Sequence, residues 1–377
     1  MADIMTDSNL RVRQAIEAFK AGEMVVVTDD DDRENEGDLI VAAVHCTPEN
    51  MAFIVRYTSG IVCAPLSRSQ AERLQLQPMV ANNDAPHSTA FTVSVDYRHD
   101  TTTGISAAER CSTVRALANP NVGAVDFVRP GHIFPLVAKE GGVLTRSGHT
   151  EAAVDLCQLA DLPPVGVISE LVNDDGTVKR GAAVAEFAKE HGLKSISVAD
   201  LITFRQRRDK LVERVGERHI QTSFGEARAI SYRTPFDPMQ HLALVFGNIH
   251  DGAPVPVRLH MEDILGDVFG ANSTLKTGAA SIAEEGRGII VYLREGGAGV
   301  ASDSERGLRG PTLSPDEDES HGSTQSREEA WREIGLGAQI LRDLDVSNIR
   351  LLASRKRHYV GLKGFGITIS ETDILDV

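Results

Sequence analysis

Short apolar runs alternate with polar stretches along the first half of the chain. The runs at residues 24–27, 39–44 and 165–168 have the length of buried β-strands and are too short for typical helices. Residues 10–19 and 181–190 instead repeat apolar side chains every three or four positions, which is typical of amphipathic helices. This mixture of strands and helices predicts an α+β fold.

The same pattern predicts further elements in both halves. In the first half these are helices beginning near Ser8, at Pro48 and after Ser106, helices over 153–157 and 201–212, and strands over 61–66, 90–96 and 195–198. After Arg218 the strands lengthen, with strands expected over 220–232, 241–246, 255–260, 289–293 and 349–352 and helices over 279–285 and 328–344. A chain of 377 residues exceeds the usual single core, so we expect two α+β domains, at residues 1–207 and 208–377.

Composition narrows the class of protein. With 41% hydrophobic and 25% charged residues, the chain is ordinary for a soluble globular protein. A net charge of −15 argues against a nucleic-acid-binding surface, because phosphate backbones require basic patches. The first residues lack the basic and apolar regions of a signal peptide, and no apolar run approaches the ~20 residues that span a bilayer. We therefore expect a cytoplasmic protein that does not contact a membrane.

The cysteines do not form a motif. Cys46, Cys63, Cys111 and Cys157 are widely spaced, and none belongs to a CxxC pair. This spacing favours neither a disulfide framework nor a cysteine-rich zinc site. We interpret the four as small, buried apolar side chains.

An acidic stretch at residues 29–38 is the first candidate for chemistry. It carries seven carboxylates in ten residues and lies between two apolar strands. Oxygen-only clusters of this kind suit hard divalent ions such as Mg²⁺ or Mn²⁺. A solvated acidic loop is the alternative interpretation. Arg33 and Gly37 interrupt the run, which a merely soluble loop would not need.

Four later segments carry further candidate side chains. Residues 101–106 combine hydroxyl groups with Gly104 before a helix, where they could contact a phosphate, although a capping box of Ser106 and Glu109 would also explain part of the segment. His132 follows a Pro-Gly step that reads as a turn, and Glu170 ends a strand. Residues 146–149 place an arginine and a histidine at a helix N-terminus, where phosphate and metal can be held together.

Residues 31–40, DDRENEGDLI, closely resemble the signature of 3,4-dihydroxy-2-butanone 4-phosphate synthase, and all five segments follow that family's order over about residues 8–210. The resemblance implies a homodimeric lyase that converts ribulose 5-phosphate to 3,4-dihydroxy-2-butanone 4-phosphate and formate for riboflavin synthesis. It implies Glu34 and His149 as ligands of Mg²⁺ or Mn²⁺, and Asp38, His132 and Glu170 as catalytic residues. The substrate contacts that it implies are Arg33, Glu34, Asp38, Thr103, Arg146, Ser147, Gly148, His149, Thr150 and Glu170.

The second half resembles GTP cyclohydrolase II over about residues 218–377. The resemblance rests on segments 224–230, 257–262, 265–270, 286–290, 335–341 and 349–352. That family holds a catalytic zinc with three cysteines, and the matching positions here are Asp263, Thr274 and Lys276. One carboxylate, one hydroxyl and one cation make a poor zinc site, so we expect no zinc and no cyclohydrolase activity.

Other positions of the cyclohydrolase pattern also differ. The family's glutamine-glutamate-glycine-arginine-glycine run is replaced at residues 295–299, and its TNNPxK region is replaced at residues 353–358. Arg332 matches the nucleophilic arginine, but Ala330 stands where the family has an acid. The glycines of 296–299 lack the ending of a phosphate loop and are interpreted as a flexible turn, and residues 302–326 as a surface loop.

Three alternatives stay open from the sequence. The protein could be bifunctional and also hydrolyse GTP with a different zinc ligand set. The second domain could bind a nucleotide without turnover or dock a separate GTP cyclohydrolase II, for which Arg258, Glu262 and Tyr292 are the retained candidates. The first domain could be a Mg²⁺-dependent sugar-phosphate aldolase or isomerase, which would not produce formate.

Overall fold

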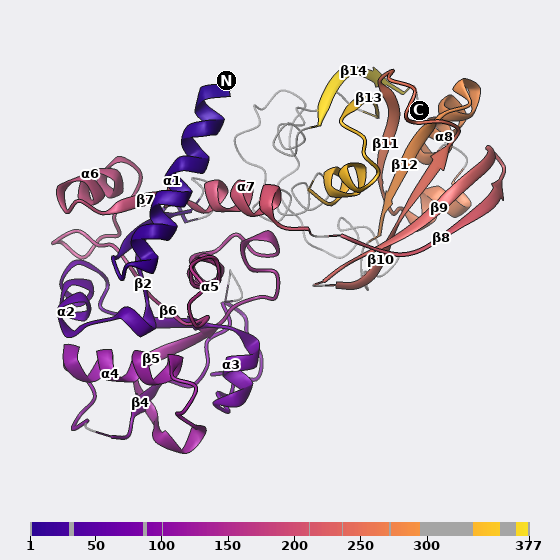
Figure 1. Cartoon of the computed structure of the whole chain (residues 1–377). Coiled ribbons are helices and arrows are strands. Elements are labelled where there is room, and N and C mark those ends of the chain that lie inside the picture. The colour runs from indigo at the N-terminus through magenta and orange to yellow at the C-terminus, as the bar shows by residue number, and fades with distance from the viewer. Residues whose placement is uncertain are drawn as a thin grey trace. The chain divides into compact units, whose positions relative to one another are not determined.

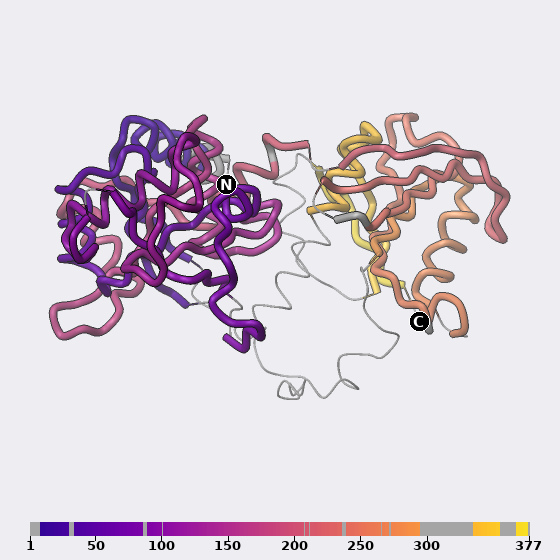
Figure 2. Tube along the Cα trace, turned by 90° about the horizontal axis from the view of Figure 1, so that it is seen from below, coloured from indigo at the N-terminus to yellow at the C-terminus, as the bar shows by residue number. Residues whose placement is uncertain are grey.

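The chain folds into two compact units, Met1–Arg205 and Gln206–Val377. The computed structural model describes residues 2–29, 34–85, 89–99, 101–210, 212–235, 237–270, 273–294, 335–354 and 367–375. Figures 1 and 2 show the first unit in indigo through magenta to rose, and the described parts of the second in rose through orange to yellow. Each unit combines a sheet with helices, which confirms the α+β class.

Unit 1 is built on a mixed sheet with the strand order β4-β5-β3-β6-β2-β1-β7. Its strands are β1 (Val25–Thr28), β2 (Gly37–Ala42), β3 (Cys63–Leu66), β4 (Val95–Tyr97), β5 (Phe127–Val137), β6 (Gly166–Glu170) and β7 (Lys194–Ser197). Its helices are α1 (Ala2–Lys20), α2 (Pro48–Tyr57), α3 (Arg68–Arg73), α4 (Ala107–Ala118), α5 (His149–Leu159) and α6 (Ala182–Glu190), and α7 (Val198–Arg208) begins in this unit. Short 3₁₀ turns are η1 (Ala43–His45), η2 (Ala124–Asp126) and η3 (Gly142–Leu144).

Helices cover both faces of this sheet (Figure 1). Alternate strand residues point to opposite faces, so Val26 and Leu39 join a core with α2, α4 and α6, whereas Val27 and Ile40 join a core with α1, α5 and α7. Burial on both faces explains why the strands read as continuous apolar runs.

Unit 2 has a sheet with the order β14-β13-β11-β12-β10-β9-β8. The strands are β8 (Glu213–Thr222), β9 (Gly225–Thr234), β10 (Asp237–Phe246), β11 (Val255–Met261), β12 (Gly288–Leu293), β13 (Asn348–Ala353) and β14 (Thr368–Ile374). A π-helical turn, η4 (Leu265–Phe269), precedes α8 (Thr274–Glu285), and residues 335–343 form a further helix. The main core packs that last helix against β11, β12 and β13.

Several elements differ from the sequence predictions. Ser8 lies inside α1, and its hydroxyl donates a hydrogen bond to Asp200 (2.5 Å). The single strand expected over 220–232 is a hairpin of β8 and β9, because Gly225 takes a φ of +116° in the turn. The strand expected over 90–96 is shortened to β4, which begins at Val95.

The Pro-Gly step before His132 was also interpreted wrongly as a turn. It lies inside β5, where a Cβ on Gly131 would come within 2.1 Å of the Val95 backbone. Glycine is needed here because β4 approaches closely.

Other interpretations are confirmed or lie outside the described residues. All four cysteines are free and buried. The capping box of Ser106 and Glu109 is present at the start of α4. The predicted loop 302–326 and the glycine-rich turn 296–299 fall outside the described residues. Among the described helices, none has the length and apolarity needed to cross a membrane.

Candidate active site

Two carboxylates meet where β2 begins and β6 ends. Asp38 and Glu170 are direct partners in the antiparallel register, so their side chains point to the same face of the sheet. Ile40 and Ile168, two residues along each strand, join the core that includes α5. The carboxylates therefore face α5. Ser59 also donates to Glu170, with 2.8 Å between Oγ and Oε2.

Asp38 is the most deeply buried acid of this group. Its side chain is 1% exposed, and its Oδ1 has no hydrogen-bond partner among the described residues. Burial, followed by repulsion from Glu170 and Glu34, raises the pKa of Asp38 well above its usual range. A buried oxygen in such surroundings requires a proton or a cation.

His149 brings a ring nitrogen to this acidic group. It is the first residue of α5 and is almost fully buried. Its Nδ1 lies 3.5 Å from Asp38 Oδ1 and 3.9 Å from Glu34 Oε2. Asp29, Glu34 and His149 each offer a ligand atom, and these atoms lie within 4.8 Å of one another. Oxygen and imidazole ligands at this spacing fit a divalent cation.

Asp29 folds the acidic loop that presents Glu34. Its carboxylate accepts hydrogen bonds from the backbone N–H groups of Glu34 (3.1 Å) and Glu36 (2.9 Å). These bonds bring the start and end of the loop together. Residues 30–33, including the predicted substrate contact Arg33, lie outside the described residues.

Arg146 lies just before α5 and is held by two partners. Its Nη1 donates to Glu151 Oε2 (2.6 Å), and its Nη2 donates to Thr89 Oγ1 (3.1 Å). Glu151 is buried, which raises its pKa, and Arg146 opposes that shift. A Cβ on Gly148 would lie 2.6 Å from Arg146 Nη1, so a larger residue here would displace this pair.

The remaining predicted contacts near α5 also surround its N-terminus. Ser147 precedes the N-cap Gly148, and Thr150 is buried in the first turn. Backbone N–H groups at a helix N-terminus favour an anion such as a phosphate. The structure therefore gathers Arg146–Thr150, Glu34, Asp38 and Glu170 into one cluster.

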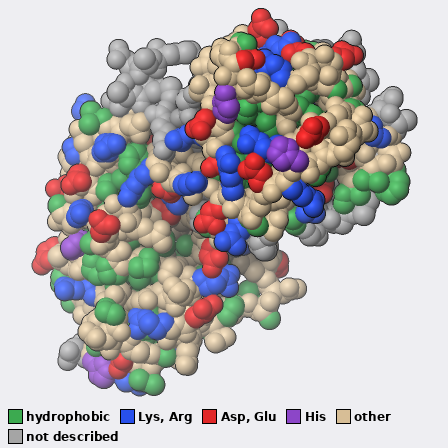
Figure 3. Space-filling model, turned by 45° about the vertical axis from the view of Figure 1, so that its right-hand side comes forward, with side chains coloured by type: hydrophobic (Ala, Val, Ile, Leu, Met, Phe, Trp, Pro, Cys, Tyr) green, Lys and Arg blue, Asp and Glu red, His purple; other side chains and the backbone are tan. Residues whose placement is uncertain are grey.

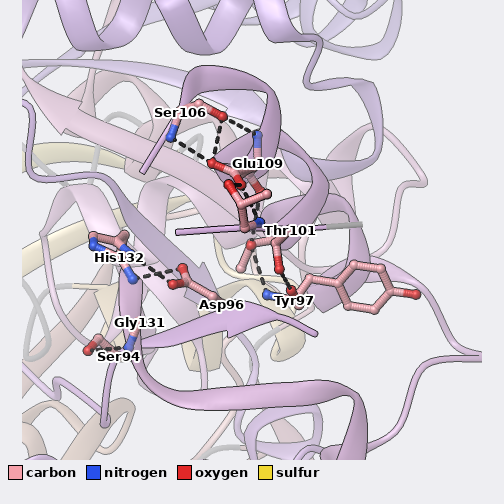
Figure 4. A network of polar contacts seen from close by, with 10 residues as sticks. Ser94, Asp96, Tyr97, Thr101, Ser106, Glu109, Gly131 and His132 are labelled. Atoms are coloured by element: carbon pink, nitrogen blue, oxygen red, sulfur yellow. Dashed lines mark hydrogen bonds and ion pairs between the residues drawn. The ribbon is translucent and has the colours of Figure 1, made fainter. Parts of the chain in front are cut away.

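A second cluster contains His132 (Figure 4). The Asp96 carboxylate accepts from the His132 backbone N–H (2.8 Å) and lies 2.8 Å from His132 Nδ1. Ser94 accepts from the N–H of Gly131 (3.1 Å). Asp96 is buried, whereas the His132 side chain is partly exposed, so the carboxylate holds the ring through Nδ1 and leaves part of it open to solvent.

The hydroxyl-rich segment 101–106 lies beside this second cluster. A Cβ on Gly104 would come within 2.1 Å of Asp96 Oδ2, and the glycine has a φ of +84°. Thr103 is exposed next to it. Glu109 accepts from Thr102 and Ser106, which lowers its pKa to about 2 and keeps it ionised. Figure 4 shows Ser106 and Glu109 in contact above the Asp96–His132 pair.

Sequence reasoning gave no individual role to three carboxylates that organise these clusters: Asp29, Asp96 and Glu151. Asp29 belongs to the acidic stretch that the sequence singled out, whereas Asp96 and Glu151 carry no local motif of their own. The available signal was a charged residue next to or within an apolar strand or helix, because such residues are rarely buried without a partner.

In unit 2, Asp263, Thr274 and Lys276 stand where the cyclohydrolase pattern has its three zinc cysteines. Lys276 donates to the Gly270 carbonyl (2.9 Å), and Asp263 accepts from the Gly266 N–H (3.0 Å). Thr274 begins α8. Glu262 forms an ion pair with Arg294 (3.1 Å).

Asp267 is the centre of a polar network in the same region. It lies 2.9 Å from His260 Nε2, and it accepts from Tyr292 (2.9 Å) and Ser273 (3.1 Å). Burial, Asp267 and then Glu262 raise the pKa of the Tyr292 hydroxyl. The hydrogen bond to Asp267 therefore gives Tyr292, which matches the cyclohydrolase pattern, a structural role.

The charged surface is mixed in sign. On the face drawn in Figure 3, Lys and Arg side chains of described residues lie among Asp and Glu side chains.

Two family models match the chain. The model described as 3,4-dihydroxy-2-butanone 4-phosphate synthase matches residues 13–204, and the model described as GTP cyclohydrolase II matches residues 213–373. The first of these therefore covers unit 1 and about half of the chain.

Several relatives match almost the whole of this chain. The riboflavin biosynthesis protein RibBA of Bacillus cereus is 44% identical over 371 residues, which cover 96% of this chain and 92% of the relative. The bifunctional riboflavin biosynthesis protein RIBA 1, chloroplastic, of Arabidopsis thaliana is 46% identical over 97% of this chain and 69% of the relative. The crystal structure of RibBX, a two domain 3,4-dihydroxy-2-butanone 4-phosphate synthase from A. baumannii, is 36% identical, covers 97% of this chain and 99% of that chain, and has a TM-score of 0.79.

Proposed function

We propose that the synthase reaction of this chain depends on Mg²⁺ or Mn²⁺ held by Glu34 and His149. The chain belongs to the family of 3,4-dihydroxy-2-butanone 4-phosphate synthases joined to a GTP cyclohydrolase II domain. The substrate is ribulose 5-phosphate, and the products are 3,4-dihydroxy-2-butanone 4-phosphate and formate. The buried acidic cluster around Asp38 carries this proposal. It combines a buried oxygen that accepts no hydrogen bond from the described residues with ligand atoms of Glu34 and His149 close by.

The residues fit a hard divalent ion. Asp29, Glu34 and Asp38 would be repelled by one another without a cation, and His149 supplies an imidazole nitrogen. Glu34 and His149 are the proposed ligands, since both oxygens of Asp29 already accept backbone hydrogen bonds. When bound, the ion would supply Lewis acidity that stabilises negative charge on substrate oxygens.

The side chains around this site are suited to proton transfer. The reaction begins with removal of a proton next to a carbonyl, and later steps lose a hydroxyl group and release formate. We assign proton donation and acceptance to Asp38, Glu170 and His132. Burial and the neighbouring acids raise the pKa of Asp38 well above its usual range, and Asp96 orients the His132 ring.

Substrate contacts are assigned to the segment before α5. Arg146, through its guanidinium, and Ser147, Gly148 and Thr150 at the start of α5 would bind the phosphate. The Gly148 N–H itself donates to the Arg146 carbonyl (2.9 Å), which fixes the shape of this segment. Thr103 and Arg33 remain predicted contacts. A homodimer that completes each site also remains a prediction, as does a domain boundary after residue 207.

The metal assignment is tested with Glu34→Gln and His149→Asn. Both variants should keep the fold and lose at least about 100-fold in kcat, because metal binding and charge stabilisation fail together. Manganese binding, measured by electron paramagnetic resonance on the same samples, should weaken in parallel. Near-native turnover in either variant would refute the assignment. Glu140→Gln, an exposed acid on the segment before α5, is the matched control.

For unit 2 we propose a cyclohydrolase fold that does not hydrolyse GTP. The support is the Asp263, Thr274 and Lys276 set, together with the absence of any cysteine after Cys157 in the sequence. Lys276 adds a positive charge where the family places a metal thiolate. If a separate GTP cyclohydrolase II catalyses the GTP reaction of riboflavin synthesis, unit 2 could bind that enzyme or a nucleotide.

One observation favours a second function, hydrolysis of GTP by unit 2. The Arabidopsis thaliana relative is named as bifunctional, and it is 46% identical to this chain. Zinc content of the purified protein separates the two possibilities. A stoichiometric zinc ion would support a second activity with an unrecognised ligand set, and a zinc-free protein would support the inactive unit.

A further inference from the structure

The segment that carries Arg146 is folded by two acids on one face of α5. Glu151 and Asp155 are four residues apart, so both side chains point to the same side of the helix. Glu151 binds the Arg146 guanidinium and also accepts from the Lys139 N–H (3.0 Å). Asp155 accepts from the Val143 N–H (2.9 Å). Both acids are almost completely buried.

Arg205 completes this arrangement from helix α7. Its Nη1 donates to Asp155 Oδ2 (2.7 Å) and to the Gly141 carbonyl (2.7 Å). The guanidinium is also buried, so the ion pair with Asp155 is shielded from solvent. A buried ion pair that binds the Gly141 carbonyl just before η3 and the Val143 N–H within η3 fixes that turn in one geometry.

The turn itself leaves little room for adjustment. Gly141 and Gly142 have φ values of +91° and +63°, which favour glycine. A Cβ on Gly142 would come within 1.9 Å of Asp155 Oδ1. The backbone N–H of Arg146 then bonds back to the Gly142 carbonyl (3.1 Å). The position of Arg146 therefore depends on where Asp155 and Arg205 hold residues 141–143.

We propose that Arg205 and Asp155 are positioning residues for substrate binding: they hold η3 so that Arg146 meets the phosphate of ribulose 5-phosphate. The inference rests on the proposed role of Arg146. Neither Arg205 nor Asp155 contacts the substrate. They act through the backbone of the turn, and Glu151 acts on the Arg146 side chain directly.

The test compares Asp155→Leu, Arg205→Met and the double variant. Each single change should raise the KM for ribulose 5-phosphate about tenfold and leave kcat within about twofold, since the binding group is displaced while the reacting groups stay in place. Asp155→Leu leaves the Arg205 charge buried alone and should unfold at a lower temperature. The double variant removes both charges and should recover thermal stability relative to Asp155→Leu.

The double variant separates positioning from stability. It lacks the bonds to Gly141 and Val143, so its KM should stay about tenfold high even though its thermal stability recovers. A KM that returns to the native value together with stability would overturn the proposal, because the pair would then serve folding alone. Arg205→Lys, which keeps a cation, should restore part of the native KM.

Two controls identify which statement has failed. Arg11→Met removes a different arginine that pairs with α7, at Asp200, and should leave the KM unchanged. Arg146→Met should raise the KM at least as much as Arg205→Met. If Arg146→Met left the KM unchanged, the proposed substrate contact would be wrong and the inference would fail with it. A raised KM in Arg146→Met with a native KM in Arg205→Met would overturn the positioning role alone.

Discussion

Asp38 and Glu170 stand directly opposite each other on the antiparallel strands β2 and β6. Like charges in such a pair are destabilising, and here burial adds to the repulsion. The site therefore concentrates negative charge before any ligand is bound. We expect this arrangement to lower the stability of the metal-free protein and to favour binding of a cation.

Replacing Asp38 by asparagine should stabilise the metal-free protein and abolish activity. The pKa of Asp38 is raised in the folded protein. The contribution of this residue to stability is therefore fully present below its pKa in the unfolded chain, about 4, and is lost as the pH rises through its pKa in the folded protein. In EDTA, the melting temperature of Asp38→Asn should exceed that of the native protein by more at pH 8 than at pH 5. Asp174→Asn, at an exposed acid, is the control and should show no such difference. Equal or lower stability of Asp38→Asn at pH 8 would contradict the repulsion argument.

Metal binding should be visible as stability. A ligand that binds only the folded state stabilises it by about 2.7 kcal/mol at 100 times its dissociation constant. Millimolar Mg²⁺ or Mn²⁺ should therefore raise the melting temperature of the EDTA-treated native protein. The same addition should leave His149→Asn nearly unchanged. An equal shift in both proteins would place the ion elsewhere.

Gly148→Ala should weaken substrate binding. The added Cβ would lie 2.6 Å from Arg146 Nη1 and 3.0 Å from Glu151 Oε2, so the buried pair must move. We expect a KM about tenfold higher and a stability loss of about 1–3 kcal/mol. Steady-state kinetics and denaturant unfolding measure both quantities. Gly123→Ala is the matched control, since its nearest neighbour would be 3.8 Å away.

Asp96→Asn should lower turnover with little change in KM. The carboxylate holds the His132 backbone and ring, and general acid–base groups contribute about 10²–10⁴ to rates. We expect kcat to fall by about 10–100-fold. Asp126 forms a similar contact with His99 (2.9 Å) outside the site, so Asp126→Asn serves as the control. Loss of activity in both variants to the same extent would argue for a structural effect.

The sequence was informative where chemistry is local. The acidic loop, the Arg146–Thr150 segment and the capping box of Ser106 and Glu109 each occupy a few consecutive residues, so their composition was readable directly. The apolar runs predicted most strands because the sheet is buried on both faces.

The sequence was least informative where a residue acts across the fold. Asp96 is adjacent to His132 only because β4 pairs with β5, and Arg205 reaches Asp155 from a helix 50 residues away. Gly131 resembled a turn residue, yet it serves a close approach of two strands. Such roles depend on long-range pairing, which composition and spacing do not encode.

The central claim is a synthase unit joined to a cyclohydrolase fold without its activity, and formate release tests both halves in one assay. The purified full-length protein would be given ribulose 5-phosphate with Mg²⁺ or, separately, GTP with zinc, because both family reactions release formate. The account predicts formate from ribulose 5-phosphate and none from GTP. Formate from GTP would show that unit 2 is active, and no formate from ribulose 5-phosphate would contradict the proposed site.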